Sequence, residues 1–332
     1  MTDLIHPDLQ AFVVEHHLAD AGAPQTWTPL AGGVSSDIWR VESPGRPAIC
    51  VKRAVEQLRV AADWHAPPER TNFEWRWFET ARAAIPGAAP RVLAHDDDRG
   101  VFAMAWLDEA THPLWKRELL AGRVDVAAAA AVGDRLGRIH AATAGRADIA
   151  AAFDTGPLFH ALRLDPYLLE AARRRPEVAP ALEAIVARTT ATRLALVHGD
   201  VSPKNILLGP HGPVFLDAET AWYGDPAFDL AFCLNHLLLK RLVVPSCAEA
   251  LAASFDALNA AYLARVDWEP PAALEARAAT LLPGLLLARV DGKSPVEYLS
   301  EGPQREAVRR VAILLVLEPV ERLDEILRVR FT

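Results

Sequence analysis

The spacing of hydrophobic and polar positions changes near residue 106 of this chain. Before it, short apolar runs between Gly- and Pro-containing turns predict hairpins over 27–41 and 91–106 and a further strand at 48–53. Two helical patterns, 6–20 and 69–82, interrupt these strands. After it, apolar residues recur at helical spacing over 126–144, 166–175, 177–193 and 225–240. We therefore predict an α+β protein with a small lobe at 1–106 that contains an antiparallel sheet, and a larger helical lobe at 107–332.

One stretch of the helical lobe is not helical in pattern. Leu196 and Val197 lead into a polar loop, a second apolar run leaves it at 206–208, and a third short strand ends on Asp217. The loop displays Asp200 and Asn205 after a histidine, His198. Two acids and an amide at one edge of a small sheet offer the oxygen ligands that Mg²⁺ prefers. A tight, Asp-rich turn between two strands would show the same His-x-Asp pattern. Other parts of the chain must therefore distinguish such a turn from a magnesium site.

Lys52 lies inside the apolar strand at 48–53, where a charged residue needs a reason. A lysine on an edge strand that reaches water is one interpretation, and a lysine that holds nucleotide phosphates is the other. The preceding turn, Gly32-Gly33-Val34-Ser35-Ser36, favours the second, because glycine lets the backbone approach a phosphate and serine can donate hydrogen bonds. Such a lysine needs a carboxylate on the following helix. The choices are Glu69, Glu74 and Glu79, and Glu74 lies on the crowded, aromatic side.

Composition limits the possible partners. With 332 residues, 51% hydrophobic and 23% charged, the chain is long enough for two domains, each with its own core. The net charge of −8 argues against a nucleic-acid or acidic-membrane partner and is compatible with a cationic substrate. Three scattered cysteines indicate free thiols, the first ten residues lack a signal-peptide pattern, and the longest apolar run, 311–317, is too short for a bilayer. We expect a cytoplasmic protein.

Lysine is rare in this chain. It occurs only at positions 52, 116, 204, 240 and 293, while arginine supplies the other thirty basic residues. A sequence that uses arginine almost everywhere is expected to keep lysine where a compact ammonium is needed.

The chain resembles the aminoglycoside phosphotransferase family, a set of small-molecule kinases with a protein-kinase-like fold. The resemblance is carried by the Gly-rich turn, Lys52, Glu74, His198-x-Asp200 with Asn205 five residues after the Asp, and Asp217. It covers most of the chain in this order, whereas the C-terminal third matches only in helical character. It implies ATP and Mg²⁺ as cofactors and a small-molecule hydroxyl as phosphoryl acceptor.

The resemblance also implies roles for single residues. Asp200 would accept the proton of the acceptor hydroxyl, while Asn205 and Asp217 would hold Mg²⁺. Asp229 would brace the catalytic loop by accepting backbone hydrogen bonds. The residues expected to contact the nucleotide are Gly33, Ser35, Ser36, Lys52, Glu74, Met104 and Trp106. Those expected to contact the acceptor are Glu219, Arg289, Asp291 and Lys293, although a charged helix end at the surface explains the last three nearly as well.

The family pattern is not matched everywhere. Lys204 stands where the family commonly has glycine, and Ser202 stands where protein kinases keep a lysine, so Lys204 is a candidate for steadying the transferring phosphoryl group. Residues 217–229 are similar to the same stretch of methylthioribose kinases, which favours a sugar as acceptor, with aminoglycosides and amino alcohols as alternatives. A catalytically inactive nucleotide-binding scaffold is the rival function. The intact set of Lys52, Asp200, Asn205 and Asp217 argues against it.

Overall fold

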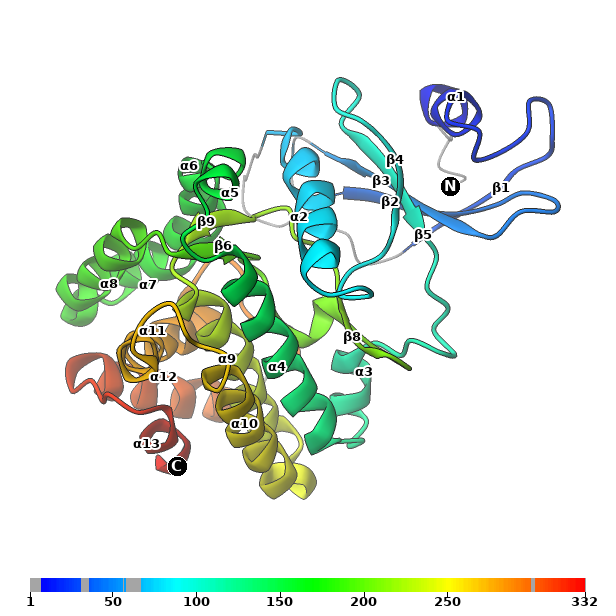
Figure 1. Cartoon of the computed structure of the whole chain (residues 1–332). Coiled ribbons are helices and arrows are strands. Elements are labelled where there is room, and N and C mark those ends of the chain that lie inside the picture. The colour runs from blue at the N-terminus through cyan, green and yellow to red at the C-terminus, as the bar shows by residue number, and fades with distance from the viewer. Residues whose placement is uncertain (1–6, 31–35, 56, 58–66, 300–301, 332) are drawn as a thin grey trace. The chain divides into compact units, whose positions relative to one another are not determined.

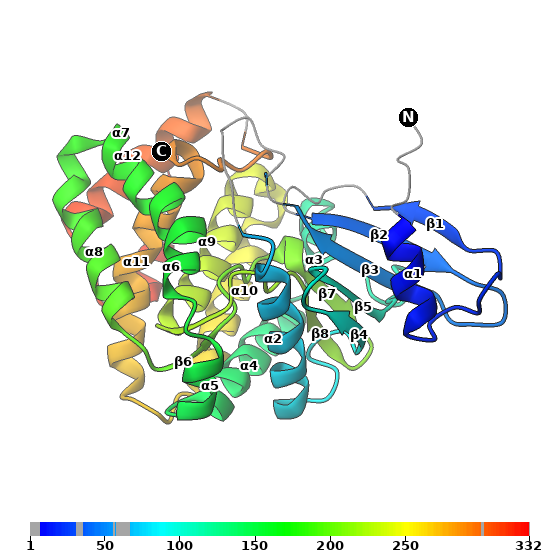
Figure 2. The same cartoon turned by 90° about the horizontal axis from the view of Figure 1, so that it is seen from above.

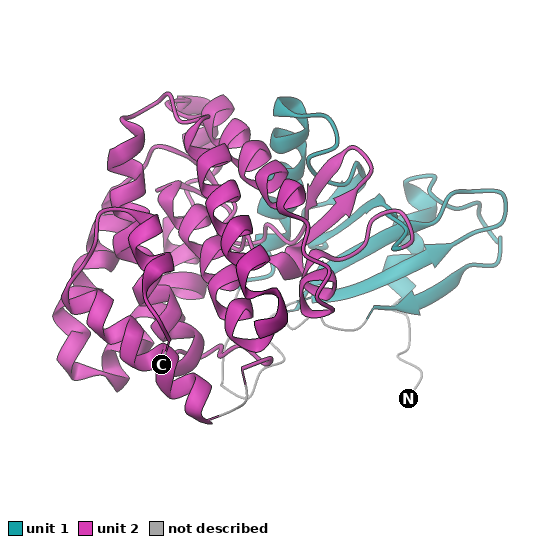
Figure 3. Ribbon diagram, turned by 90° about the horizontal axis from the view of Figure 1, so that it is seen from below, with its two compact units in different colours: residues 1–109 teal, residues 110–332 magenta. Residues whose placement is uncertain are grey.

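The computed structural model describes residues 7–30, 36–55, 57, 67–299 and 302–331. The chain divides into two compact units, residues 1–109 and residues 110–332, coloured separately in Figure 3. Each unit has its own secondary structure and its own buried residues.

The first unit is built on the antiparallel sheet that the sequence predicts. Its strands follow the spatial order β1-β2-β3-β5-β4, and every pair is antiparallel (Figure 1). The strands are β1 (Thr26–Pro29), β2 (Ser36–Glu42), β3 (Ile49–Ala54), β4 (Val92–Asp96) and β5 (Val101–Ala105). Two helices, α1 (Pro7–Glu15) and α2 (Arg70–Ala84), accompany the sheet (Figures 1 and 2). The unit thus consists of one sheet and its covering helices.

Alternation along the strands assigns each side chain of β3 to one face of the sheet. Val51 belongs to the apolar cluster that contains Phe12 of α1, so odd positions of β3 face α1. Lys52 pairs in register with Phe102, whose ring lies 6.0 Å from that of Phe78 on α2. The even positions therefore face α2, and Lys52 points toward the helix that carries the candidate glutamates.

The second unit is mainly helical. In Figure 1, α4, α9 and α10 lie side by side, and α11 packs against α9 and α12. The α-helices are α3 (Trp115–Leu120), α4 (Val126–Thr143), α5 (Ala147–Ala152), α6 (Gly156–Phe159), α7 (Glu170–Arg174), α8 (Ala179–Ala191), α9 (Ala227–Val243), α10 (Ala248–Leu263), α11 (Pro271–Asp291), α12 (Gly302–Leu317) and α13 (Leu323–Arg328). None of the helices in the described part of the chain is long and apolar enough to cross a membrane.

Between α6 and α7 the chain forms a π-helix, η1 (His160–Leu169), with Pro166 inside it. The predicted helix start at Pro166 was wrong, because helical structure already begins at Gly156. Proline is common at the first position of an α-helix, which explains the prediction, but the wider turns of a π-helix accommodate it here. The shift matters because η1 carries Arg163, which lies 3.0 Å from the carboxylate of Asp200.

Two small sheets frame the polar loop at 198–205. The strand before it, β6 (Ala195–Val197), pairs with β9 (Trp222–Gly224), and the strand after it, β7 (Ile206–Gly209), pairs with β8 (Gly212–Phe215). The loop is therefore anchored at both ends by antiparallel pairing, as the strand–loop–strand pattern predicts.

Candidate functional site

Lys52 and Glu74 form a buried ion pair in the first unit. The Lys52 Nζ lies 2.7 Å from Glu74 Oε2, and the two side chains are only 3% and 1% exposed. Of the three candidate glutamates, the structure pairs Lys52 with Glu74. The pair fixes the ammonium at one position, which is what a phosphate-binding lysine requires.

The other nucleotide candidates of the first unit are described in part. Gly33 and Ser35 lie outside the described residues, whereas Ser36 begins β2 and is buried, with no hydrogen-bond partner for its hydroxyl among the described side chains and backbone. Met104 is buried in β5, opposite Cys50. The Trp106 ring lies 5.1 Å from the guanidinium of Arg40, a cation–π contact that holds it against β2.

In the second unit, Asp229 holds the first half of the loop at 198–205. Its carboxylate accepts hydrogen bonds from the backbone N–H groups of His198, at 2.7 Å, and Gly199, at 2.8 Å. His140 also contacts this carboxylate, at 3.2 Å, and all of these groups are buried. This is the bracing contact that the sequence predicts for Asp229.

His198 ties the loop to the segment that precedes Asp217. Burial lowers the pKa of its imidazole, which is therefore neutral near pH 7. The Asp200 backbone N–H donates to Nδ1 at 3.1 Å, so Nε2 carries the proton and donates to the Leu216 carbonyl at 2.9 Å. The Leu216 N–H in turn donates to the Asn205 carbonyl at 2.9 Å. These bonds bring the loop residues Asp200 and Asn205 beside the start of the Asp217 segment.

Gly199 makes the tight passage between His198 and Asp200 possible. Its φ is +81°, and a Cβ at this position would lie 2.6 Å from the Thr220 Oγ1 and 2.8 Å from the Thr220 carbonyl oxygen. Asp217 also has a left-handed backbone, with φ of 64°. Strained backbone of this kind persists where surrounding contacts enforce it, and it concentrates at functional sites.

Two cations hold Asp200. Its Oδ2 lies 3.0 Å from Arg163 and 3.0 Å from Lys204, while its buried Oδ1 has no hydrogen-bond partner among the described residues. Burial alone would raise the pKa of Asp200, but Lys204 and Arg163 outweigh it, so the pKa lies below its ordinary value. Asp200 is thus an ionised carboxylate with one oxygen occupied and the other directed at no protein donor that the structure describes.

The residues proposed to hold Mg²⁺ fit a hard cation. The Asn205 Nδ2 donates to the Asp200 carbonyl at 3.1 Å, which leaves the amide oxygen as the end available to a cation. With the carboxylate of Asp217 this gives two oxygen donors, and Mg²⁺ commonly takes the remainder from phosphates and water. No group of three His, Cys, Asp or Glu residues suited to a metal occurs in the described part of the chain. Asn205 and Asp217 therefore fit a Mg²⁺ ion whose other ligands include phosphate oxygens.

The predicted acceptor residues differ in their surroundings. Glu219 is buried, and its charge adds to the larger effects of Asp200 and Tyr167 that raise the pKa of Arg163 against the opposing effect of burial. Asp291 ends α11 between Arg175 and Arg309, with 2.7 Å contacts to each. Both of its oxygens are occupied, which favours a structural role for Asp291 in joining α7, α11 and α12.

The other two predicted acceptor residues lie near η1. Arg289 is buried and donates to the Tyr167 hydroxyl at 3.0 Å. Lys293 lies 3.7 Å from Asp165, and its backbone N–H donates to the Pro166 carbonyl. Arg289 is therefore the member of the predicted set whose surroundings suit ligand binding.

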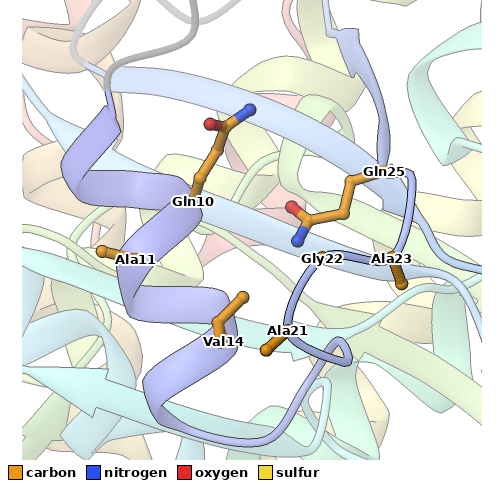
Figure 4. Close-up of a pocket in the computed structure, with 7 residues that line it drawn as sticks. All are labelled: Gln10, Ala11, Val14, Ala21, Gly22, Ala23 and Gln25. Atoms are coloured by element: carbon orange, nitrogen blue, oxygen red, sulfur yellow. The ribbon is translucent and has the colours of Figure 1, made fainter.

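A surface pocket of the first unit lies elsewhere. Figure 4 shows it beside α1, lined by Gln10, Ala11, Val14, Ala21, Gly22, Ala23 and Gln25. It has no charged lining residue and contains none of the predicted site residues, so it offers nothing for a phosphate or a metal.

No sequence signal identified Arg163 or Tyr167. Arg163 also donates from Nε to the Gly199 carbonyl at 2.6 Å, and its guanidinium lies 5.8 Å from the Tyr167 ring. No local motif marks these residues, because they approach Asp200 only through tertiary packing. The rarity of lysine was the one usable signal, and it marked Lys52, Lys116, Lys204, Lys240 and Lys293 alike.

Comparison with known proteins relates the chain to phosphotransferases. Residues 26–279 match the phosphotransferase enzyme family. Over 258 residues the chain is 25% identical to the methylthioribose kinase of Yersinia pseudotuberculosis, an alignment that covers 70% of this chain and 63% of that protein. The chain thus spans less than two thirds of the length of the curated relatives that it matches.

Solved structures agree on the fold. The macrolide 2'-phosphotransferase of Brachybacterium faecium has a TM-score of 0.51 at 17% identity and covers 94% of this chain and 97% of its own. The Plasmodium vivax ethanolamine kinase has a TM-score of 0.53 at 11% identity, and the match covers 96% of this chain and 86% of that protein. At these identities the likeness concerns the fold alone, and it confirms the predicted protein-kinase-like fold.

Proposed function

Because this chain belongs to the phosphotransferase enzyme family, we propose that it is an ATP-dependent kinase that phosphorylates a hydroxyl group of a small molecule. One observation carries the proposal. Asp200 is an ionised, buried carboxylate with a single unoccupied oxygen, and its loop is tied to Asn205 and to the segment of Asp217. A carboxylate that accepts a hydroxyl hydrogen next to oxygen ligands for Mg²⁺ is the arrangement that phosphoryl transfer needs.

Each group of the site has a distinct task in this proposal. Lys52, oriented by Glu74, would bind the nucleotide phosphates, and the Ser36 hydroxyl would donate to them. Mg²⁺ held by Asn205 and Asp217 would neutralise negative charge that develops on the phosphoryl group. In the transfer itself, the acceptor oxygen bonds to the γ-phosphorus, the bond to the bridging oxygen of ADP breaks, and the hydroxyl proton passes to Asp200.

Arg163 and Lys204 position the carboxylate of Asp200. Both bind Oδ2, so the orientation of Oδ1 is fixed before the acceptor arrives. Lys204 is 45% exposed and carries a compact ammonium with three donors, which suits it to contact the transferring phosphoryl group as well. Arg163, only 8% exposed, is restricted to the positioning role.

The likeness to a methylthioribose kinase supports a sugar-like acceptor, with amino alcohols and aminoglycosides as the alternatives. Replacement of Asp200 by Asn tests the reaction. We expect ADP release from MgATP, measured with pooled hydroxyl compounds, to fall roughly 10²–10⁴-fold, because the carboxylate that takes the proton is lost. Asp134→Asn is the matched control, since Asp134 pairs with Arg265 on the surface of the same unit. Wild-type turnover by Asp200→Asn would refute the proposal, and a chain that binds MgATP without turnover would be a nucleotide-binding scaffold.

A further inference from the structure

Two buried cations of the second unit, Lys240 on α9 and Arg289 on α11, have no acidic partner among the described residues. Lys240 is 1% exposed and Arg289 is 7% exposed. The Lys240 Nζ lies 3.5 Å from the Tyr298 hydroxyl and 4.5 Å from the centroid of its ring. Arg289 donates to Tyr167 and leaves its Nε without a partner in the described part of the chain. Cations this deeply buried normally have a carboxylate beside them.

Direct contacts connect these two cations to Asp200 within the unit. Arg163 bridges the Asp200 carboxylate and the Tyr167 ring, and Tyr167 accepts the hydrogen bond from Arg289. The ring of Phe232 lies 5.8 Å from that of Tyr167 and 5.5 Å from that of His236, whose Nδ1 meets the same Tyr298 hydroxyl as Lys240. Asp200 and the cations therefore belong to one packed cluster.

His236 completes the cluster. Its ring lies 5.5 Å from that of Phe232, and its Nδ1 lies 2.9 Å from the Tyr298 hydroxyl that also meets Lys240. Its buried Nε2 has no hydrogen-bond partner among the groups that the structure describes. Two buried nitrogen atoms, in His236 and Arg289, are thus left for a ligand to engage.

Four positive charges act on His236. Burial lowers the pKa of His236 well below its ordinary value, and the charges of Lys240, Arg289, Lys204 and Lys116 lower it further. Burial, with a smaller effect of Lys116, lowers the pKa of Lys240 to about 7. Cys233 and, more weakly, Glu297 oppose this effect on the pKa, and Glu297 is already bound to Lys116. Three of the five lysines of the chain thus act on His236.

We infer that the acceptor carries an anionic group, a carboxylate or a phosphate, which Lys240 and Arg289 bind while its hydroxyl lies at Asp200. This inference rests on the proposed function and names the class of its acceptor. An anion supplies the charge that the two cations lack, and charge-assisted hydrogen bonds from a buried site are strong. A cationic acceptor such as an amino alcohol would meet like charge at the same place.

Lysine NMR tests anion binding separately from catalysis. Because the chain has only five lysines, selective ¹³C labelling at the ε-carbon gives five resolvable signals, and Lys240→Met assigns one of them. We expect millimolar inorganic phosphate or D-glycerate to move the Lys240 signal and to raise its pKa, since a bound anion stabilises the ammonium. Arg241→Met, one residue along α9, is the matched control and should keep this response. A Lys240 signal that titrates near its ordinary value and ignores both anions overturns the inference.

A series of related acceptors that differ in charge links the proposed anion site to the reaction. Glucose, glucose 6-phosphate and glucosamine share one pyranose ring and differ at a single substituent, which is neutral, anionic or cationic, and transfer from MgATP to each is measured by product formation. We expect kcat/KM for an anionic member to exceed those of the neutral and aminated members at least tenfold, a preference that Lys240→Met removes mainly through KM. Preference for the aminated member overturns the inference. If neither this series nor the pooled hydroxyl compounds are phosphorylated while phosphate still moves the Lys240 signal, the proposed function fails and the anion site stands.

Discussion

The buried ammonium of Lys240 predicts a pH-dependent loss of stability. Its pKa falls from the ordinary value of 10.5 to about 7 in the folded chain, chiefly because burial disfavours the charged form. Between these values the unfolded chain holds the proton and the folded chain does not. The free energy of unfolding therefore rises as the pH rises from about 7 to about 10.5. Below about pH 7, the buried charge of Lys240 destabilises the folded chain by its full amount.

The size of this penalty follows from the same numbers. At about 1.4 kcal/mol per pH unit, the difference between 10.5 and about 7 amounts to about 5 kcal/mol. Lys240→Met removes the charge, keeps a similar length of apolar chain, and gives up a cation–π contact worth about 1–2 kcal/mol. We expect the variant to unfold at a higher urea concentration than the wild type, with a gain of about 3 kcal/mol near pH 6.5 that shrinks toward pH 10.

Urea unfolding at several pH values, in buffers without small anions, measures this gain. Arg241→Met makes the same charge change on the same helix, but Arg241 is not fully buried and donates to the Leu327 carbonyl, so its effect should not depend on pH in this way. A Lys240→Met chain that is no more stable than the wild type near pH 6.5 would refute the reasoning. A lysine that destabilises its own fold is expected where function needs it.

Three further predictions concern the predicted active site. Glu74→Gln should lower the free energy of unfolding by about 3 kcal/mol and raise KM for ATP, because it removes the carboxylate of a buried ion pair; unchanged urea midpoint and KM would contradict it. Gly199→Ala should destabilise by about 1–3 kcal/mol and abolish turnover, whereas Gly145→Ala, which has φ of +67° but nothing within 4 Å of the added methyl, isolates the backbone cost alone. Arg163→Met should raise the pKa of Asp200, so the acid limb of the kcat/KM profile should move to higher pH, and an unmoved limb would exclude the positioning role.

Much of the fold could be predicted from the sequence because the relevant signals are local. Alternation along β3 and β5 defines the antiparallel sheet, and the Pro-Pro and Pro-Gly pairs enclose α2. The pairing of Lys52 with Glu74 also follows from local periodicity, since the even face of β3 meets the inner face of α2. The loop at 198–205 could be found because its polar residues interrupt two apolar strands.

The surroundings of Asp200 could not be predicted in the same way. Arg163 reaches Asp200 from a π-helix, and a 3.6-residue period places side chains of such a segment on the wrong faces. Lys240 and Tyr298 are 58 positions apart, so only tertiary packing brings them together. Asp291 and Lys293 were predicted from their position at a helix end, a signal that does not tell a ligand-binding charge from one that pairs with neighbouring arginines.

The wide turns of η1 make the position of Arg163 sensitive to chain length. Such a turn is equivalent to one additional residue inserted into an α-helix, and each residue of an α-helix rotates the chain by about 100°. Deleting one residue between 160 and 162 would allow ordinary helical turns and would carry the guanidinium around the axis, away from the carboxylate that it now holds. The orientation of the proposed base thus depends on the number of residues in a neighbouring helix as well as on their identity.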